Sequence, residues 1–296
     1  MRVAVTGSSG LIGTALVTSL RAEGQHEVVR LVRRPSSAPD EVQWDPEGGS
    51  VDLDGLAGVE GVVHLAGVGI GDRRWTDSYK RRIRDSRILG TRTLVRALGS
   101  LDPVPRVLVS ASGVHAYGDR GDEHLTEESS RGTGFLPDLV RDWEAEAEAA
   151  AEAGTRVAFA RTGILLAPSA GLVGRLKPLF KLGAAGPIGD GRNWWSWITL
   201  PDEVAAMRFL LDHDISGPVN LTAPEPQRQS DVIRAIARAW HRPAVIRAPK
   251  RAVRAVIGEF VDDITESQLA TPEVLLAAGF AFQHRRIDEG AAWVTS

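Results

Sequence analysis

The chain has 296 residues, a formal charge of -3 and no cysteine. This length predicts one dominant domain with a smaller annex, and the nearly balanced charge offers no broad positive field to a nucleic-acid backbone. The absence of cysteine excludes disulfides and cysteine metal sites, and the seven histidines show no metal-ligand spacing. No apolar run reaches the roughly 18 residues that span a bilayer, and no charged leader precedes the first apolar run. We therefore expect a soluble, cytoplasmic protein that needs no metal and binds neither nucleic acid nor membrane.

Short apolar runs alternate with segments of helical period along the first half of the chain. Strands are predicted over Val3–Thr6, Glu27–Val32, Val42–Trp44, Gly61–Ala66, Val107–Ser110 and Arg156–Ala160. Helices are predicted over Leu11–Glu23, Thr76–Leu98 and Leu139–Ala153. This alternation favours an α/β fold with a doubly wound parallel sheet of the Rossmann type.

The pattern changes after Arg161, where glycine and proline become frequent. Two further strands are predicted over Trp195–Thr199 and Pro218–Leu221, with a helix over Asp202–Leu211 between them, and the end of the chain reads as short helices. We predict a sheet domain over residues 1–165 that is completed by 194–223. A smaller, mostly helical region over 166–193 and 224–296 would cover the carboxyl ends of the strands, where such folds bind ligands.

The first predicted strand runs directly into a glycine-rich turn. The turn is Thr6-Gly7-Ser8-Ser9-Gly10-Leu11-Ile12-Gly13, and a helix follows it. Gly7 would permit a tight turn, Gly10 would let the backbone approach a pyrophosphate, and Gly13 would bring the helix close to the strand. The helix N-terminus adds unpaired N–H groups for the anion. The glycines could simply shape a turn, but strand, spacing and helix together favour a dinucleotide site.

About 20 residues beyond Gly13, an acid normally holds the ribose 2′-hydroxyl of NAD, but this chain has Arg33 and Arg34 there. A guanidinium cannot accept a hydrogen bond from a hydroxyl, whereas it pairs in bidentate fashion with a 2′-phosphate. Unless the two arginines end the strand by chance, Arg33 favours NADP(H) over NAD as the cofactor.

Further motifs follow at the ends of later strands and helices. They are His64-Leu65-Ala66-Gly67, Asp85-Ser86-Arg87, Ser110-Ala111-Ser112, Arg161-Thr162-Gly163, Ser196-Trp197-Ile198 and Gly217-Pro218-Val219-Asn220. With them, nearly the whole chain resembles the extended short-chain dehydrogenase/reductases. More narrowly, it is similar to a subgroup of epimerase-family proteins whose substrate is generally unassigned. The resemblance implies a Rossmann fold with a small, mostly helical C-terminal substrate domain.

The resemblance also implies which residues contact the cofactor. It places Gly7, Ser9, Gly10, Leu11 and Ile12 at the pyrophosphate, Arg33 at the 2′-phosphate, and Leu65, Ala66 and Gly67 near the ribose and nicotinamide. Arg87 is a further candidate for a cofactor contact, within a run of basic residues that otherwise reads as a solvated helix face.

Most members of that superfamily carry a catalytic Tyr-x-x-x-Lys dyad, which this chain lacks. No lysine stands four residues after Tyr79 or Tyr117, the two tyrosines of the chain. The positions that the resemblance assigns to the dyad hold Leu136 and Val140, and neither side chain can exchange a proton.

Hydride transfer at a carbonyl still requires a proton donor near the oxygen. The catalytic candidates are Ser112, which matches the superfamily's substrate-binding serine, and Tyr117, although they could instead cap a loop and pack in the core. His115 could also act near neutral pH, but the subgroup usually has glycine at this position.

Two further segments are expected to lie near the site or on the surface around it. Trp194, Trp195 and Trp197 lie on a glycine-rich segment, where they would either line a substrate cleft or anchor the annex. Glu144–Glu152 is expected to form an exposed acidic helix face.

Two functions are compatible with these features. The first is an NADP(H)-dependent oxidoreductase or epimerase-like enzyme that transfers a hydride at a hydroxyl or carbonyl carbon of a small molecule, such as a sugar nucleotide or another carbonyl compound. The second is a catalytically inactive NADP(H)-binding sensor that signals through a partner protein. The resemblance also implies a homodimer, since dimers are common in the superfamily.

Overall fold

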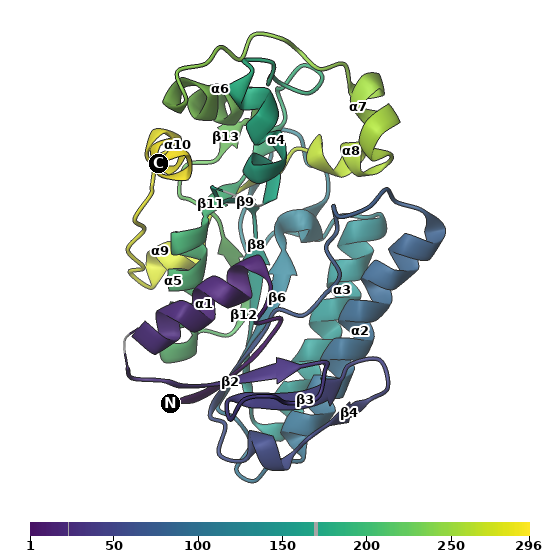
Figure 1. The fold of residues 1–296 in the computed structure, drawn as a ribbon, viewed down its shortest axis with the longest axis vertical. Coiled ribbons are helices and arrows are strands. Elements are labelled where there is room, and N and C mark those ends of the chain that lie inside the picture. Colours follow the sequence, from purple (N-terminus) through teal and green to yellow (C-terminus); the bar gives the residue numbers. More distant parts are fainter. Residues whose placement is uncertain (23, 169–170) are drawn as a thin grey trace.

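A central eight-stranded sheet organises the computed structural model, which describes residues 1–22, 24–168 and 171–296 (Figure 1). In spatial order its strands are β12 (Gly217–Leu221), β8 (Arg156–Thr162), β6 (Val107–Gly113), β5 (Gly61–His64), β1 (Arg2–Thr6), β2 (Glu27–Val32), β3 (Glu41–Asp45) and β4 (Ser50–Val51). Neighbouring strands are parallel except β3 and β4. The order reverses beside β1, so the predicted doubly wound sheet is confirmed, and its ligand edge lies at the carboxyl ends of β1, β5 and β6.

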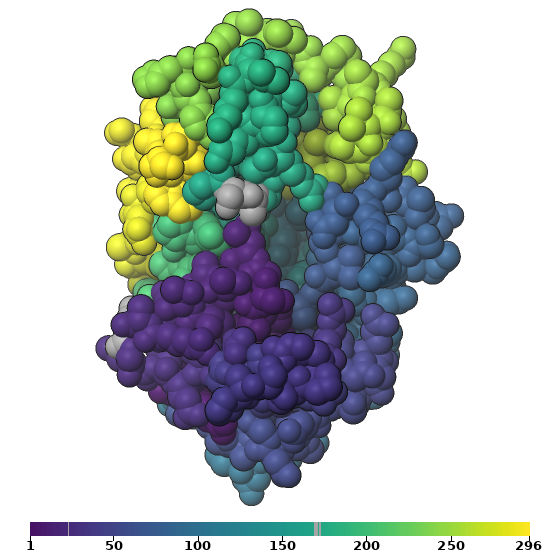
Figure 2. Space-filling model, viewed as in Figure 1, coloured from purple at the N-terminus to yellow at the C-terminus, as the bar shows by residue number. Residues whose placement is uncertain are grey.

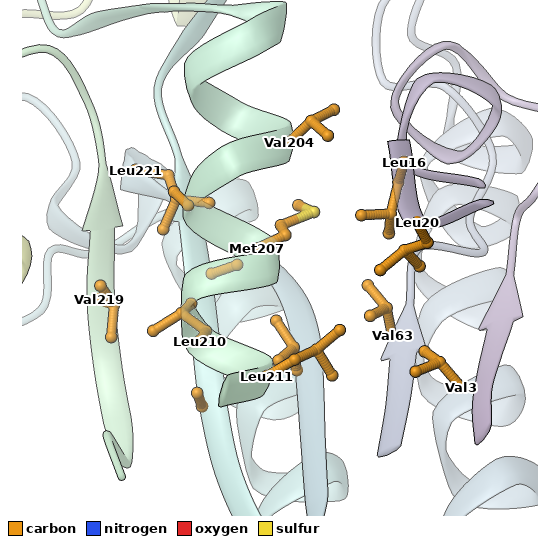
Figure 3. Packing of buried hydrophobic residues seen from close by; sticks show 14 of the residues in the cluster. Val3, Leu16, Leu20, Val63, Val204, Met207, Leu210, Leu211, Val219 and Leu221 are labelled. Atoms are coloured by element: carbon orange, nitrogen blue, oxygen red, sulfur yellow. The ribbon is translucent and has the colours of Figure 1, made fainter. Parts of the chain in front are cut away.

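Helices cover both faces of this sheet. The helices α1 (Leu11–Ala22) and α5 (Leu200–Asp212) lie on one face, and α2 (Asp77–Gly99) and α3 (Phe135–Glu148) lie on the other. Leu16 and Leu20 of α1 pack with Met207 and Leu210 of α5 over Val63 of β5 (Figure 3). Because the hydrophobic effect is non-directional, this contact holds the helices against the sheet but orients no functional group. The site is formed by polar residues at the strand ends. Glu23, the predicted end of the first helix, lies outside the described residues.

Two central strands extend beyond their predicted ends. β6 and β8 pair over seven residues, from Val107 with Arg156 to Gly113 with Thr162. The last residues of both strands are small or polar and show no apolar alternation, so the sequence pattern missed them, but the ladder pairs their backbone groups. The extension carries Ser112 and Thr162 to the ligand edge of the sheet.

The start of α3 was also predicted too late. The helix begins at Phe135 because Pro137 is tolerated in the first turn, where its missing N–H has no helical partner. A 3₁₀ turn, η3 (Ala149–Ala153), follows α3, and two others are η1 (Asp54–Leu56) and η2 (Val114–Tyr117).

The remaining elements lie largely above the ligand edge, in the upper part of Figure 1. The helices are α4 (Gly171–Lys181), α6 (Gln229–Ala239), α7 (Lys250–Ile257), α8 (Phe260–Ile264), α9 (Glu273–Ala277) and α10 (Ile287–Thr295). The strand pairs are β9 (Ile164–Leu166) with β11 (Trp197–Thr199), β10 (Trp194–Trp195) with β13 (Gln227–Arg228), and β7 (His124–Leu125) with β14 (Leu269–Ala270). No helix in the described ranges is long and apolar enough for a bilayer crossing.

The strand predicted over Trp195–Thr199 is wrong in two respects. It is divided into β10 and β11, and both pair outside the central sheet, whereas β12 joins that sheet as predicted. Trp195 and Trp197 pack in a second apolar cluster with α6 and α10, away from the central sheet, whereas Ile198 packs in the main core. Residues 169–170 of the predicted helical region lie outside the described ranges.

Candidate active site

The turn between β1 and α1 has a shape that requires glycine. Gly7 has a φ of +65°, and a Cβ there would lie 2.8 Å from the carbonyl carbon of Leu65. A Cβ on Gly13 would lie 2.2 Å from the carbonyl oxygen of Gly7, so glycine alone lets α1 begin this close to the strand. Gly10 donates its N–H to the Gly7 carbonyl at 2.9 Å and closes the turn. The N-terminus of α1 therefore opens onto the ligand edge.

A buried hydrogen-bond network positions the segment opposite this turn. The Thr6 hydroxyl accepts from the backbone N–H groups of Leu65 and Ala66, at 3.0 and 3.1 Å, and lies 2.7 Å from His64 Nδ1. Both acceptor positions of Thr6 are then used, so its proton goes to Nδ1, and His64 Nε2 donates to Thr91 at 3.0 Å. Burial lowers the pKa of His64 to about 4, so the ring stays neutral and acts as a structural bridge.

Two adjoining cavities form one cleft along the ligand edge. The Arg33 cavity, of about 720 Å³, reaches the end of β2, and the Ser112 cavity, of about 490 Å³, reaches the end of β6. Both volumes are typical of small-molecule sites. Figure 2 shows a hollow that is bordered by α1 and α4 on one side and by the blue segment on the other. Every residue predicted to contact the cofactor lines this cleft, namely Gly7, Ser9, Gly10, Leu11, Ile12, Arg33, Leu65, Ala66, Gly67 and Arg87.

The two arginines after β2 differ in their partners. Arg34 donates to both carboxylate oxygens of Glu41, at 2.8 and 2.6 Å, and the hydrogen bonds from Arg34 and the Ser37 amide hold the pKa of Glu41 at about 2. Arg33 is exposed, lines the Arg33 cavity and makes no hydrogen bond or ion pair with any described residue. Of the two guanidiniums, that of Arg33 is therefore the one available to an anion.

Arg87 is a buried cation without a carboxylate partner among the described residues. Its side chain lines the Ser112 cavity, the residue is 8% exposed, and Nη1 donates to the carbonyls of Val68 and Ile83 at 2.9 and 3.2 Å. The Nε atom is buried with no hydrogen-bond partner in the described chain, and the guanidinium carbon lies 5.0 Å from the Trp143 ring centre. Burial lowers the pKa of Arg87 to about 10, so it remains a cation at neutral pH. This environment suits an anionic ligand group.

Helix α3 forms an apolar wall of the Ser112 cavity. Its lining residues, Leu136, Leu139, Val140 and Trp143, recur at helical spacing on one face. Leu136 and Val140, at the positions expected for the missing dyad, thus face the cavity. This wall offers a ligand apolar contact and no proton.

Ser112 lines the cavity from the end of β6. Its hydroxyl donates to Glu144 Oε1 at 2.5 Å, and Arg161 donates to both oxygens of the same carboxylate at 2.9 Å. Burial alone would raise the pKa of Glu144, but the bonds from Arg161 and Ser112 and the charge of Arg131 outweigh it and lower the pKa. Because the carboxylate is ionised, it can only accept, so it accepts the one hydrogen bond that the Ser112 hydroxyl can donate. Ser112 therefore presents only lone pairs to the cavity. The expected exposed acidic face is therefore wrong at Glu144, which is 3% exposed.

Tyr117 does not fit its candidate role as a proton donor. The side chain is fully buried and does not line the cavity. Its hydroxyl donates to Asn220 Oδ1 at 2.8 Å and accepts from Arg161 at 3.1 Å, so both functions of the oxygen serve the core. These contacts match the alternative prediction, in which Tyr117 is a packing residue of the core.

The tryptophans of the glycine-rich segment lie outside both cavity linings. Trp195 and Trp197 are buried, and their indole N–H groups donate to the carbonyls of Ile264 and Glu225 at 3.0 Å each. Trp194 donates to Asp122 at 2.9 Å. These contacts match the second of the two predicted roles, in which the tryptophans anchor the annex above the sheet.

The sequence profile of the NAD dependent epimerase/dehydratase family matches residues 3–222. The chain belongs to this family. A second sequence profile, that of a domain of unknown function, matches residues 248–294 of this chain. An epimerase family protein of Mycobacterium leprae is 43% identical over 296 residues, which cover 99% of this chain and 95% of the relative.

Solved structures agree with this membership. The crystal structure of human epimerase family protein SDR39U1 with NADPH has a TM-score of 0.89 and 28% identity, and the match covers 100% of this chain and 99% of that one. The nucleoside-diphosphate sugar epimerase of Corynebacterium glutamicum has a TM-score of 0.82 and 36% identity, with 100% of this chain and 58% of that chain covered. The predicted family and the Rossmann-type fold of this epimerase-family protein are thus confirmed.

Proposed function

We propose that this protein is an NADP(H)-dependent oxidoreductase or epimerase that transfers a hydride at a hydroxyl or carbonyl carbon of a small molecule. The observation that carries the proposal is the continuous cleft, with the unpaired Arg33 in one cavity and Ser112 in the other. The structure of the human relative with NADPH supports the cofactor, and the name of the C. glutamicum relative supports a sugar nucleotide as the substrate class. We also propose that the upper region, 166–193 and 224–296, binds the substrate; its position above the ligand edge and Gly171 in the lining of the Ser112 cavity support this.

The residues of the cleft suit successive parts of NADP(H). Arg33 would hold the 2′-phosphate, the N-terminus of α1 would hold the pyrophosphate, and Arg87 would neutralise a further anionic group. Bound NADPH would supply a hydride with its electron pair to a carbonyl carbon. The apolar wall of α3 would keep water from this transfer, because Leu136, Val140 and Trp143 carry no group that binds bulk water at the cavity surface.

Replacing Arg33 by glutamate (Arg33→Glu) should weaken NADPH binding by about 10- to 100-fold and change NADH binding by less than about 3-fold, because only NADPH loses a charge-assisted contact. Calorimetric titrations of wild type and variant with both cofactors provide the measurement. The control is Arg81→Glu, which makes the same charge change at an exposed position of α2 outside both cavity linings. Equal losses for the two cofactors would refute the 2′-phosphate assignment. Failure of wild type to bind either cofactor would refute the proposed function itself.

Ser112→Ala should leave the Kd for NADPH within about 2-fold of wild type and lower kcat by about 10- to 100-fold, because the lone pairs that orient a substrate hydroxyl are lost. The substrate for this test is whichever ketone, aldehyde or keto sugar nucleotide wild type reduces, and turnover is followed by the loss of NADPH absorbance. Unchanged kcat would remove Ser112 from the mechanism.

The apolar wall of α3 favours a second candidate function, an NADP(H) sensor without catalysis. Leu136 and Val140 leave the cavity without the superfamily's acid on that side. A sensor should bind NADPH tightly and oxidise it with none of the carbonyl compounds tested, whereas an enzyme should oxidise it with at least one.

A further inference from the structure

We infer that His115, held by Asp263 of α8, is the proton donor and acceptor that replaces the missing dyad. This inference rests on the proposed function. It names a residue of η2, which packs against α3, and through Asp263 it draws the upper region of the chain into the chemistry.

The geometry places His115 at the reacting end of the cleft. The residue belongs to η2, directly after β6, and lines the Ser112 cavity together with Ser112 and Gly113. Its Nε2 lies 3.3 Å from Asp263 Oδ1, within ion-pair distance when the imidazole is protonated, and that carboxylate oxygen is buried with no hydrogen-bond partner among the described residues. A Cβ at position 113 would lie 2.8 Å from His115 Nδ1, so glycine there makes room for the imidazole. Nδ1 makes no hydrogen bond within the described ranges and is the nitrogen free to act.

The other polar side chains of the cavity cannot supply the proton. Ser112 donates its proton to Glu144, and Thr162 donates its proton to Glu203 at 2.6 Å. Arg87 is the other ionisable side chain in the described lining, and it holds its proton too firmly at neutral pH. His115 is left as the group that can both give and take a proton.

The charges around His115 favour its protonated form. Burial lowers the pKa of His115, but the carboxylates of Asp263 and Glu266 outweigh burial and the opposing charge of Arg87, and the net direction is upward. Glu266 has its own pKa raised to about 7 by burial and by the neighbouring Asp263. The imidazolium, which these charges favour, is the form that reduction of a carbonyl requires.

The proton step balances the hydride step. When the carbonyl carbon gains the hydride, the electron pair of the C=O π bond moves to the oxygen, which forms an O–H bond as the N–H bond at His115 Nδ1 breaks. The neutral imidazole regains a proton from solvent through the exposed 26% of its side chain. In the oxidising direction the same nitrogen takes the proton of the substrate hydroxyl.

A test that needs no substrate uses the charge of the nicotinamide ring, which is positive in NADP⁺ and neutral in NADPH. Protonated His115 should repel NADP⁺ alone, so the ratio of the Kd of NADP⁺ to that of NADPH should rise about 10-fold from about pH 9 to about pH 6. The 2′-phosphate titrates in both cofactors and cancels in the ratio. His115→Gln should abolish this rise, and Asp263→Asn should move it to lower pH.

Two controls separate His115 from other titrating groups. Glu266→Gln should keep the rise and move it slightly to lower pH, and His213→Gln, which changes an exposed histidine outside both cavity linings, should leave it unchanged. For any compound that wild type reduces, His115→Gln should lower kcat by about 10²- to 10⁴-fold with little change in KM. A pH-independent ratio in wild type, or a rise that persists in His115→Gln, would overturn the inference while cofactor binding still supported the proposed function. If wild type binds neither cofactor, both fail.

Discussion

Replacing Arg161 by methionine is expected to lower the free energy of unfolding by about 3–5 kcal/mol. Arg161 and Glu144 are each 3% exposed, and two hydrogen bonds of 2.9 Å join the guanidinium to the carboxylate. The same guanidinium donates to Tyr117 at 3.1 Å. Without this cation the buried carboxylate keeps only the ion pair with Arg131, whose side chain is 36% exposed, and loses the buried partner that best offsets its desolvation. Urea unfolding at neutral pH, followed by tryptophan fluorescence, measures the loss.

An exposed ion pair between α2 and α3 is the matched control. Arg84 donates to Asp142 at 2.6 Å, but its side chain is 45% exposed, so Arg84→Met should cost less than about 1 kcal/mol. The double variant Arg161→Met/Glu144→Met should recover much of the loss, because no charge is then left buried. A loss at Arg161 no larger than that at Arg84 would show that the buried network is not a main source of stability.

The stability of Glu203→Gln relative to wild type should increase as the pH rises from about 5 to about 8, because wild type alone loses the contribution of a neutral Glu203. Glu203 is fully buried, its Oε2 has no hydrogen-bond partner among the described residues, and burial raises its pKa to about 8. The carboxyl is therefore neutral in the folded protein, whereas the unfolded chain ionises it at its ordinary, lower pKa. Between these two values the unfolded state releases a proton that the folded state retains, so the contribution of Glu203 to stability declines by up to roughly 1 kcal/mol per pH unit.

Thermal and urea unfolding of wild type and Glu203→Gln across this pH range test the linkage. The variant should match wild type near pH 5 and exceed it by a few kcal/mol near pH 8, because the amide keeps the acceptor for Thr162 and cannot ionise. Glu152→Gln, at an exposed position, should follow the wild-type curve. Parallel curves for wild type and Glu203→Gln would contradict the raised pKa of Glu203.

Helix α3 shows how far a local pattern reaches. Leu136, Val140, Trp143 and Ala147 form a stripe with helical spacing, and Glu144 lies within that stripe, so its burial was open to prediction from periodicity. The run of acidic residues that follows obscured this signal. What the pattern could not supply is the partner, because Arg161 reaches Glu144 from the end of a different element, β8.

The sequence by itself determined the family, the doubly wound sheet and the glycine turn, and it located the residues that line the cleft. These features depend on short-range signals, namely apolar alternation and glycine spacing. The absence of the Tyr-x-x-x-Lys dyad can likewise be read directly from the sequence. Only the tertiary structure decided that the Tyr117 hydroxyl bonds within the core, that Ser112 donates its hydrogen bond to Glu144, and that His115 lies beside Asp263. Burial and the charge of a polar side chain depend on partners that packing brings together from distant parts of the chain, and no local pattern contains them.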